Sequence, residues 1–422
     1  MTTPFPKMLL AKQRFAVAPP LDISAVVTSE LSRMRARLKP GARVAVAVGS
    51  RGISNLQTIV TTVIESLRAA QTEPFVIPAM GSHGGATPEG QTELLAEYGI
   101  TEKHLGVPIK ASMDVQRIGG TAHGVDVFCS AEAMRADGIV LINRIKPHTD
   151  FGGTLGSGIL KMMVVGLGKQ VGAARYHVTC SRIGYEETLR SIARVTLQHA
   201  PILCGIGIVE NQLHETARIA VLLREEIEAR EQELFTDAKR LMPKLPFDDI
   251  DFLIVDRIGK NVSGSGMDPN VIGRGVHGYS AFLGQKNLPP PRIKRIFARD
   301  LTPETHGNAI GIGFADLTTT RLVEKIDKQV TYVNALTALT PNGAKIPIHF
   351  DTDREAVERG LNSLGLEDIS QARVIRIQDT LSLERIELSE AYLPELAGRK
   401  DIDVKREPAE MKFDRDGNLE PL

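Results

Sequence analysis

The chain has 422 residues, which predicts two or three domains with a sizeable core. Basic and acidic side chains both number 51, so the formal net charge is zero and no basic field favours nucleic acid or an anionic membrane as a partner. The three cysteines form no Cys-x-x-Cys pair, which favours neither disulfides nor a cysteine zinc site. With no apolar stretch of about eighteen residues, we expect a soluble, cytoplasmic protein.

The first half of the sequence predicts strands and helices in alternation. An apolar, β-branched run at 43–48 is typical of a buried strand, and the amphipathic segment 54–70 is typical of a helix. Further strands are expected at 73–80 and 136–143. This order indicates βαβ units and a mainly parallel sheet.

A proline-rich turn at 243–246 separates this region from a new apolar strand at 250–255. We therefore predict a larger N-terminal catalytic domain, 1–243, and a smaller C-terminal domain, 244–422. Both are expected to be α/β, with the active site in the cleft between them. The polar residues at the C-terminal end are expected to be loosely held.

Basic and imidazole side chains follow three of the predicted strands. Ligands of parallel sheets bind beyond the carboxyl ends of the strands, so these side chains are expected at one edge. Arg51 follows the first strand, His83 the second, and Arg144, Lys146 and His148 the third. A single turn histidine more often hydrogen-bonds its own loop. Two on one edge could act as acid and base, because their unperturbed pKa is about 6.5.

Lys161 interrupts the apolar run 158–167, where an ammonium group is costly to bury. Its amine either reaches an acid or solvent, or it is a desolvated amine that forms a covalent adduct. Farther along the chain, His177 is a candidate metal ligand, although a single histidine is more often structural. The glycine-rich loops 49–52 and 153–158 could cradle phosphate, but each is explained as well by a tight turn.

Four segments of the first domain carry a resemblance to a known family: GSRG (49–52), PAMGSHGGATPEG (78–90), NRIKPHTDFGG (143–153) and SGILKMMVVGLGKQVGAARYH (157–177). Together they resemble the nickel-dependent lactate racemase family. The resemblance implies a two-domain α/β enzyme with the nickel-pincer nucleotide, a nicotinic-acid-derived mononucleotide that dedicated maturation enzymes supply.

The resemblance also implies roles for single residues. Lys161 would hold the cofactor through a thioamide, and His177 would be the protein ligand of nickel. His83 and His148 would be the paired acid and base. The implied reaction is racemisation or epimerisation of a 2-hydroxy acid: one histidine takes the hydroxyl proton while the carbon-bound hydrogen leaves as hydride, and the opposite histidine serves the other enantiomer.

The sequence departs from the lactate-specific members of the family. Ser50 and Arg51, implied to hold the cofactor phosphate or the substrate, stand in VGSRG, where those members usually have Asp-x-Thr-Arg-Pro. His83 is followed by glycine instead of arginine, and the segment between the second histidine and the lysine is longer. We therefore expect a divergent member that acts on a larger hydroxy acid, such as a sugar acid or a dicarboxylate. Candidate carboxylate-binding side chains are Arg144, Lys146, Lys260 and Arg274.

Two other functions are compatible with the same residues. A hydrolase would bind zinc directly through the histidines and leave Lys161 with a structural role. A non-catalytic protein would hold a small anion and perform no chemistry. Metal analysis separates the first function from a racemase, and turnover separates the second.

Overall fold

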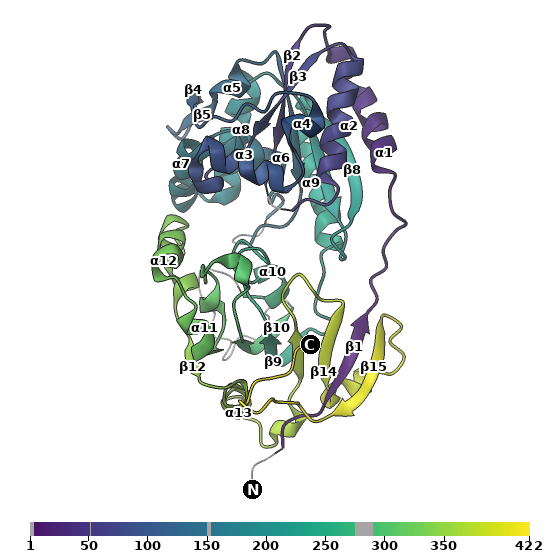
Figure 1. Cartoon of the computed structure of the whole chain (residues 1–422), viewed down its shortest axis with the longest axis vertical. Coiled ribbons are helices and arrows are strands. Elements are labelled where there is room, and N and C mark those ends of the chain that lie inside the picture. Colours follow the sequence, from purple (N-terminus) through teal and green to yellow (C-terminus); the bar gives the residue numbers. More distant parts are fainter. Residues whose placement is uncertain (1–3, 51, 150–152, 275–289) are drawn as a thin grey trace. The chain divides into compact units, whose positions relative to one another are not determined.

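The computed structural model describes residues 4–50, 52–149, 153–274 and 290–422. The chain forms two compact units (Figure 1). The N-terminal unit is Val17–Met242, and the C-terminal unit combines Met1–Ala16 with Pro243–Leu422. Both units are α/β with mostly parallel sheets, which confirms the predicted fold class.

A five-stranded sheet of order β3-β2-β6-β7-β8 forms the centre of the N-terminal unit. Its strands are β2 (Arg43–Val48), β3 (Glu73–Pro78), β6 (Gly138–Arg144), β7 (Ile202–Glu210) and β8 (Thr216–Leu223). All neighbouring pairs are parallel except β7 and β8. The three strands predicted in the first half of the chain are thus confirmed. A separate hairpin consists of β4 (Val115–Gly120) and β5 (Asp126–Ser130).

Both faces of this sheet are buried, as the alternation along β2 shows. Val44 and Val46 belong to one apolar cluster, and Ala45 and Ala47 to another on the opposite face. The helices of the unit are α1 (Ile23–Leu31), α2 (Leu56–Ala69), α3 (Pro88–Glu97), α4 (Glu102–Leu105), α5 (Ala131–Met134), α6 (Ile159–Lys161), α7 (Lys169–Ile183), α8 (Tyr185–His199) and α9 (Ile227–Arg240).

The C-terminal unit has an eight-stranded sheet of order β12-β11-β10-β9-β13-β14-β1-β15. Its strands are β1 (Met8–Gln13), β9 (Asp249–Val255), β10 (Arg292–Ala298), β11 (Leu317–Thr319), β12 (Ile348–Phe350), β13 (Val374–Ile377), β14 (Arg385–Ser389) and β15 (Ile402–Ala409). Its helices are α10 (Pro269–Ile272), α11 (Thr320–Glu324), α12 (Lys328–Thr337), α13 (Asp353–Asn362) and α14 (Leu393–Leu396).

The first strand of the chain belongs to the C-terminal unit. β1 pairs antiparallel with both β14 and β15, and Leu9 and Ala11 are fully buried there. The predicted first domain, 1–243, therefore differs from the N-terminal unit at its N-terminal end, since residues 1–16 lie in the other unit. The cause is strand pairing across more than 370 positions of sequence, which local pattern does not reveal.

The C-terminal residues are held in place, so the expectation that they are loose is wrong. Leu419 is buried, and its carbonyl accepts a hydrogen bond from Arg299 at 2.8 Å. The carbonyl of Glu420 accepts one from Arg376 at 2.5 Å. These contacts anchor the tail to the buried arginines of the C-terminal sheet.

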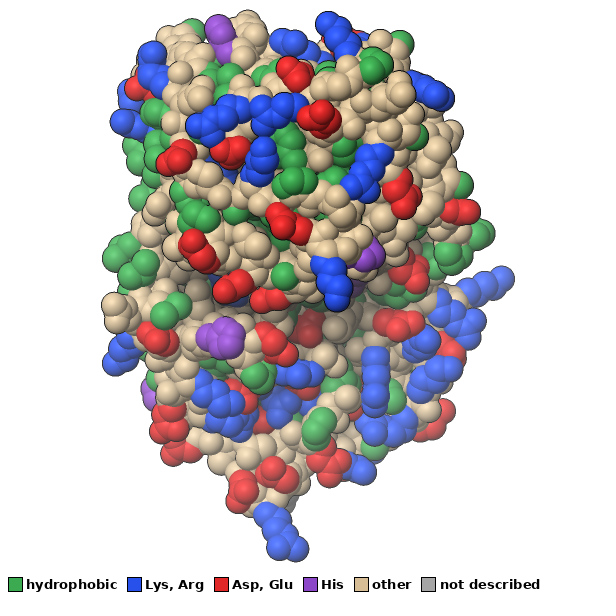
Figure 2. All heavy atoms as spheres, turned by 45° about the horizontal axis from the view of Figure 1, so that its top comes forward, with side chains coloured by type: hydrophobic (Ala, Val, Ile, Leu, Met, Phe, Trp, Pro, Cys, Tyr) green, Lys and Arg blue, Asp and Glu red, His purple; other side chains and the backbone are tan. Residues whose placement is uncertain are grey.

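Acidic and basic side chains are interspersed on the face shown in Figure 2, in agreement with a net charge of zero. In the described part of the chain, no helix has the length and apolar character needed to cross a membrane.

Candidate active site

The loops that leave β3, β2 and β6 meet at the carboxyl edge of the N-terminal sheet, as predicted. Ser50 follows β2, and its Oγ lies 2.5 Å from Nδ1 of His83, which follows β3. The backbone N–H of Gly49 donates to the carbonyl of Ile142 in β6 at 3.4 Å. The parallel order β3-β2-β6 thus brings two of the predicted site residues into contact and places the third exit beside them.

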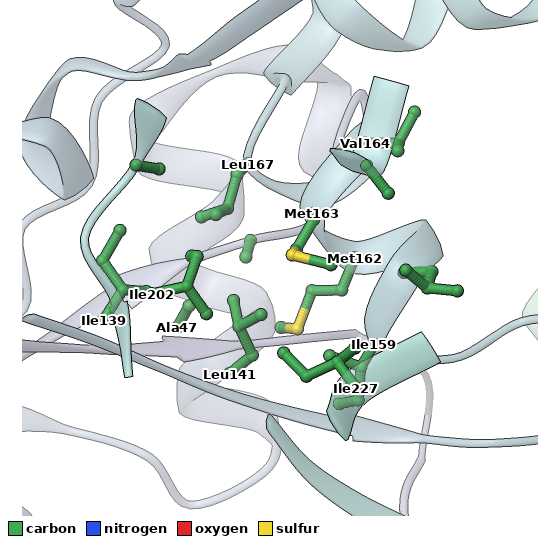
Figure 3. Close-up of a cluster of buried hydrophobic side chains, with 14 of the residues drawn as sticks. Ala47, Ile139, Leu141, Ile159, Met162, Met163, Val164, Leu167, Ile202 and Ile227 are labelled. Carbon is green, nitrogen blue, oxygen red and sulfur yellow. The ribbon is translucent and has the colours of Figure 1, made fainter. Parts of the chain in front are cut away.

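Lys161 lies on a segment that packs against the sheet. Ile159 and Met163 are fully buried and Met162 nearly so, and Figure 3 shows these side chains among Leu141 and other apolar residues of the core. The apolar residues on either side of Lys161 therefore belong to the packed core of the unit. A π-helical turn, Met162–Gly166, follows Lys161 directly. Such turns are rare in proteins, and those that occur are frequently found at functional sites.

Lys161 and His148 are in direct contact. The distance between Lys161 Nζ and His148 Nε2 is 2.5 Å. When the amine is charged it can only donate, and the facing imidazole nitrogen is then the acceptor. The loop that carries His148 is closed by two backbone hydrogen bonds of 2.9 Å between Lys146 and Ser157. The structure thus brings together the two residues to which the resemblance gives the roles of base and tether.

A series of aromatic contacts connects His148 with His177. The ring centroids of His148 and Tyr185 are 5.1 Å apart, those of Tyr185 and Tyr176 are 5.3 Å apart, and those of Tyr176 and His177 are 5.5 Å apart. Tyr176 is fully buried, and this burial raises the pKa of its phenol well above the ordinary value. His177 therefore lies in the same region as the lysine and histidine pair, on α7.

The loop of His83 and the segment of Lys161 are packed backbone against backbone. The N–H of Gly81 donates to the carbonyl of Gly166 at 3.4 Å. A Cβ atom on Gly166 would lie 2.7 Å from the carbonyl oxygen of Ala79, so only glycine permits this approach. The predicted site residues from the two segments are therefore carried by elements in contact.

A buried carboxyl group, Glu231 of α9, holds the start of the Lys161 segment. It accepts a hydrogen bond from the N–H of Leu160 at 2.8 Å, and a Cβ atom on Gly158 would lie 2.0 Å from its Oε1. Its complete burial raises its pKa to about 8, although the amides of Leu160 and Ile159 act in the opposite direction. The group is consequently mostly protonated at neutral pH.

Arg144 and Lys146, two predicted substrate ligands, also lie in this region. Arg144 forms an ion pair with Glu210, whose other oxygen accepts a hydrogen bond from the N–H of Ser54 at 2.8 Å. Lys146 contributes its backbone to the loop closure described above and is partly buried. Arg51, the predicted phosphate or substrate ligand, lies outside the described residues.

The other two predicted substrate ligands lie in the C-terminal unit. Lys260 donates to the carbonyl of Gly264 at 2.8 Å. Arg274 is buried, and its guanidinium donates to the carbonyl of Phe314 and pairs with Asp316, each at 2.7 Å. These contacts give Arg274 a structural role, and its predicted contact with a substrate gains no support.

Within the described residues, no group of three or more His, Cys, Asp or Glu side chains is arranged to hold a metal. A protein-only zinc site built from the histidines therefore has no ligand set there.

Sequence reasoning missed Tyr185 and Glu231. Tyr185 contacts His148 through its ring, and Glu231 holds the segment of the lysine. A glutamate among the buried positions of an amphipathic helix was the available signal for Glu231, because charged side chains are rarely buried without a partner. Tyr185 begins a helix, and nothing in its local sequence points to the site.

The comparisons with known proteins agree with this architecture. Residues 23–187 match the family model of the lactate racemase N-terminal domain. The fold is similar to that of the lactate racemase apoprotein from Thermoanaerobacterium thermosaccharolyticum, with a TM-score of 0.54 and 13% identity, covering 86% of this chain and 93% of that chain. A Thermotoga maritima protein gives a TM-score of 0.53 at 13% identity, covering 87% and 99%. No curated protein matches the sequence.

Proposed function

We propose that this protein racemises or epimerises a 2-hydroxy acid with a nickel-pincer nucleotide attached to Lys161, because residues 23–187 match the family model of the lactate racemase N-terminal domain. This match favours chemistry of the racemase type. The observation that supports the proposal most is the 2.5 Å contact between Lys161 and His148, on a segment packed against the loop of His83.

The residues present are compatible with this cofactor. Lys161 would carry it, and His177 would be the protein ligand of the metal. Because the described residues provide no three-donor site, the remaining metal donors would come from the cofactor. When bound, the cofactor would supply the acceptor for the hydrogen on C2 of the substrate.

The two histidines would exchange protons with the substrate hydroxyl. Their strands, β3 and β6, flank β2, so the two histidines follow strands that are about 10 Å apart, two strand spacings. Ser50 orients the ring of His83 through Nδ1. Acylation of Lys161 would remove its positive charge, so His148 would lose an ammonium neighbour and could accept a proton at Nε2.

The substrate is proposed to be larger than lactate, a sugar acid or a dicarboxylate. Arg144 and Lys146 lie at the same sheet edge as the histidines and are the candidate carboxylate ligands there. Arg144 is already paired with Glu210, so a substrate carboxylate would have to compete with that ion pair.

The attachment is tested by intact mass of protein produced together with the cofactor maturation enzymes. We expect an adduct on Lys161 that is absent from the matched variant Lys161→Arg, which keeps the positive charge. Active protein with an unmodified Lys161 would contradict the attachment.

The reaction is tested by incubating loaded protein in heavy water with a panel of 2-hydroxy and sugar acids. We expect loss of stereochemical purity for one substrate with its C2 hydrogen retained, and no turnover in His83→Gln or His148→Gln. Hydrolysis with stoichiometric zinc would favour the hydrolase, and ligand binding without turnover would favour the anion-binding protein.

A further inference from the structure

We propose that Lys169 is a positioning residue that holds His83 in place through the side-chain amide of Gln91. The proposal rests on the catalytic role proposed above for His83. Its contacts, however, lie entirely within the N-terminal unit and do not depend on the identity of the substrate.

Lys169 is 1% exposed and is the first residue of α7. Its ammonium group donates to the carbonyl of Pro78 at 2.6 Å and to Oε1 of Gln91 at 2.9 Å. Both acceptors are neutral, and within the described ranges Lys169 takes part in no ion pair. The amine therefore serves as a hydrogen-bond donor between two structural elements.

Gln91, which accepts from Lys169, in turn donates hydrogen bonds to the loop of His83. The residue is fully buried in α3, and its Nε2 donates to the carbonyls of Gly81 and His83 at 3.0 and 3.2 Å. An ammonium group can be bonded only by the amide oxygen, so Lys169 determines which end of the amide faces the loop. With the amide fixed in this way, both carbonyls of the loop receive a donor.

The arrangement carries a cost that packing does not explain. Lys169 has φ +53°, an unusual conformation for a residue with a side chain. Its burial lowers the pKa of the amine to about 8, since the charged form loses its hydration. A buried lysine in a strained backbone persists where the surrounding structure requires it, and such residues cluster at functional sites.

Lys169 also follows directly on the segment of the proposed cofactor lysine. The π-helical turn after Lys161 ends at Gly166, and α7, which begins at Lys169, carries His177. A single amine thus couples the proposed cofactor segment to the proposed acid/base group on the neighbouring loop.

Two variants test the proposal in cofactor-free protein labelled with ¹³C in the histidine rings. Lys169→Met removes the donor, and Gln91→Glu keeps an acceptor for Lys169 but cannot donate to the carbonyl of His83. We expect both to shift the ring signal of His83, assigned with His83→Gln, and its titration midpoint. In loaded enzyme, kcat should fall about ten- to a hundredfold with little change in KM.

Leu67→Ala is the matched control. Leu67 is nearly fully buried in the apolar cluster of α2, so its truncation lowers stability without touching Gln91 or Lys169. We expect its His83 signal to match that of the unmodified protein. This control separates positioning from a general loss of stability.

The proposal is overturned if the His83 signal stays unchanged in whichever of the two variants folds. Because this measurement needs no turnover, it is independent of the proposed reaction. A shifted signal in a protein that racemises nothing would leave the positioning role standing and remove the function. An unshifted signal in an active racemase would remove the positioning role of Lys169 and leave the proposed function standing.

Discussion

The hydroxyl of Ser50, in the loop after β2, contacts the imidazole of His83, in the loop after β3. Its 2.5 Å distance to His83 Nδ1 makes it a hydrogen-bond partner that orients the imidazole. An imidazole with one nitrogen engaged presents the other in a defined direction, which a proton transfer requires.

Replacing Ser50 by alanine should therefore slow the reaction without unfolding the protein. Loss of one such hydrogen bond is worth about 1 kcal/mol, so kcat should fall roughly fivefold to tenfold. Steady-state kinetics with the substrate found in the panel would measure it. Ser82→Ala is the control, because Ser82 is the exposed neighbour of His83. Equal effects of the two substitutions would remove the role assigned to Ser50.

Glu231 should make stability depend on pH in a direction unusual for a carboxylate. Its pKa is about 8 in the folded protein against an ordinary value of 4.5. Between these pH values the folded state holds a proton that the unfolded chain has released. The contribution of Glu231 to the free energy of unfolding therefore falls as pH rises from about 4.5 and becomes constant above about 8.

The variant Glu231→Gln should lack this dependence. Its free energy of unfolding should match the parent near pH 4.5 and exceed it by a few kcal/mol near pH 9, on the order of the pKa difference. Urea unfolding at the two pH values measures it. Glu233→Gln, an exposed position on the same helix, should change neither value. If the difference between Glu231→Gln and the parent were the same at both pH values, Glu231 would not have the raised pKa.

At the residue level, the sequence revealed the side chains whose chemistry stands out from their surroundings. Lys161 was noticed because it interrupts an apolar run, and His148 because it follows a strand. Their mutual contact could not be predicted from the sequence, since it depends on how a loop of the third strand folds back. Lys169 was missed although it lies in the same stretch, because its acceptors come from Pro78 and Gln91.

At the level of elements, α9 packs closely against the segment that carries Lys161 because Gly158 has no side chain. Gly158 has φ −176°, which any residue adopts, so the need for glycine comes from space alone. A methyl group there would lie 2.0 Å from Glu231 Oε1.

Gly158→Ala should thus destabilise the protein by about 1–3 kcal/mol through overpacking. Thermal unfolding measures this loss, and Gly120→Ala is the control, since the nearest atom to its new Cβ would be 3.7 Å away. In a Glu231→Ala background the carboxyl group that would clash is gone, so adding Gly158→Ala should lower the free energy of unfolding much less than it does in the parent. Additive losses in the double variant would show that the clash is not the cause.

The elements that could be predicted are those with a clear period. β2 lies at the predicted residues, 43–48, and α2 covers most of the predicted helical segment 54–70. The π-helical turn could not be predicted, because an apolar run of ten residues is compatible with a strand, a helix or a distorted helix. β1 was missed for a different reason, since its partners lie at the other end of the chain.

At the level of the whole molecule, each unit has its own apolar clusters, but the units differ in how they use the sequence. The N-terminal unit is one continuous segment, whereas the C-terminal unit needs two. We therefore expect the fragment 17–242 to unfold cooperatively on its own, as followed by circular dichroism.

The fragment 243–422 should be much less stable alone, because β14 and β15 lose the strand between them. Fusion of residues 1–16 to it should restore a cooperative transition at higher temperature, whereas the same fusion with Leu9→Asp should not, since that side chain is fully buried. Equal melting temperatures with and without residues 1–16 would contradict this dependence.

The position of β1 also has a consequence for biosynthesis. Residues 8–13 leave the ribosome long before residues 385–389 and 402–409, with which they pair. At about 5–20 residues per second, the strand waits roughly twenty seconds to more than a minute for its partners. The N-terminal unit can fold during that interval, so a short apolar strand stays exposed on the nascent chain until its partner strands have been made. Chaperones that bind exposed apolar segments of nascent chains would therefore have time to bind Met8–Gln13.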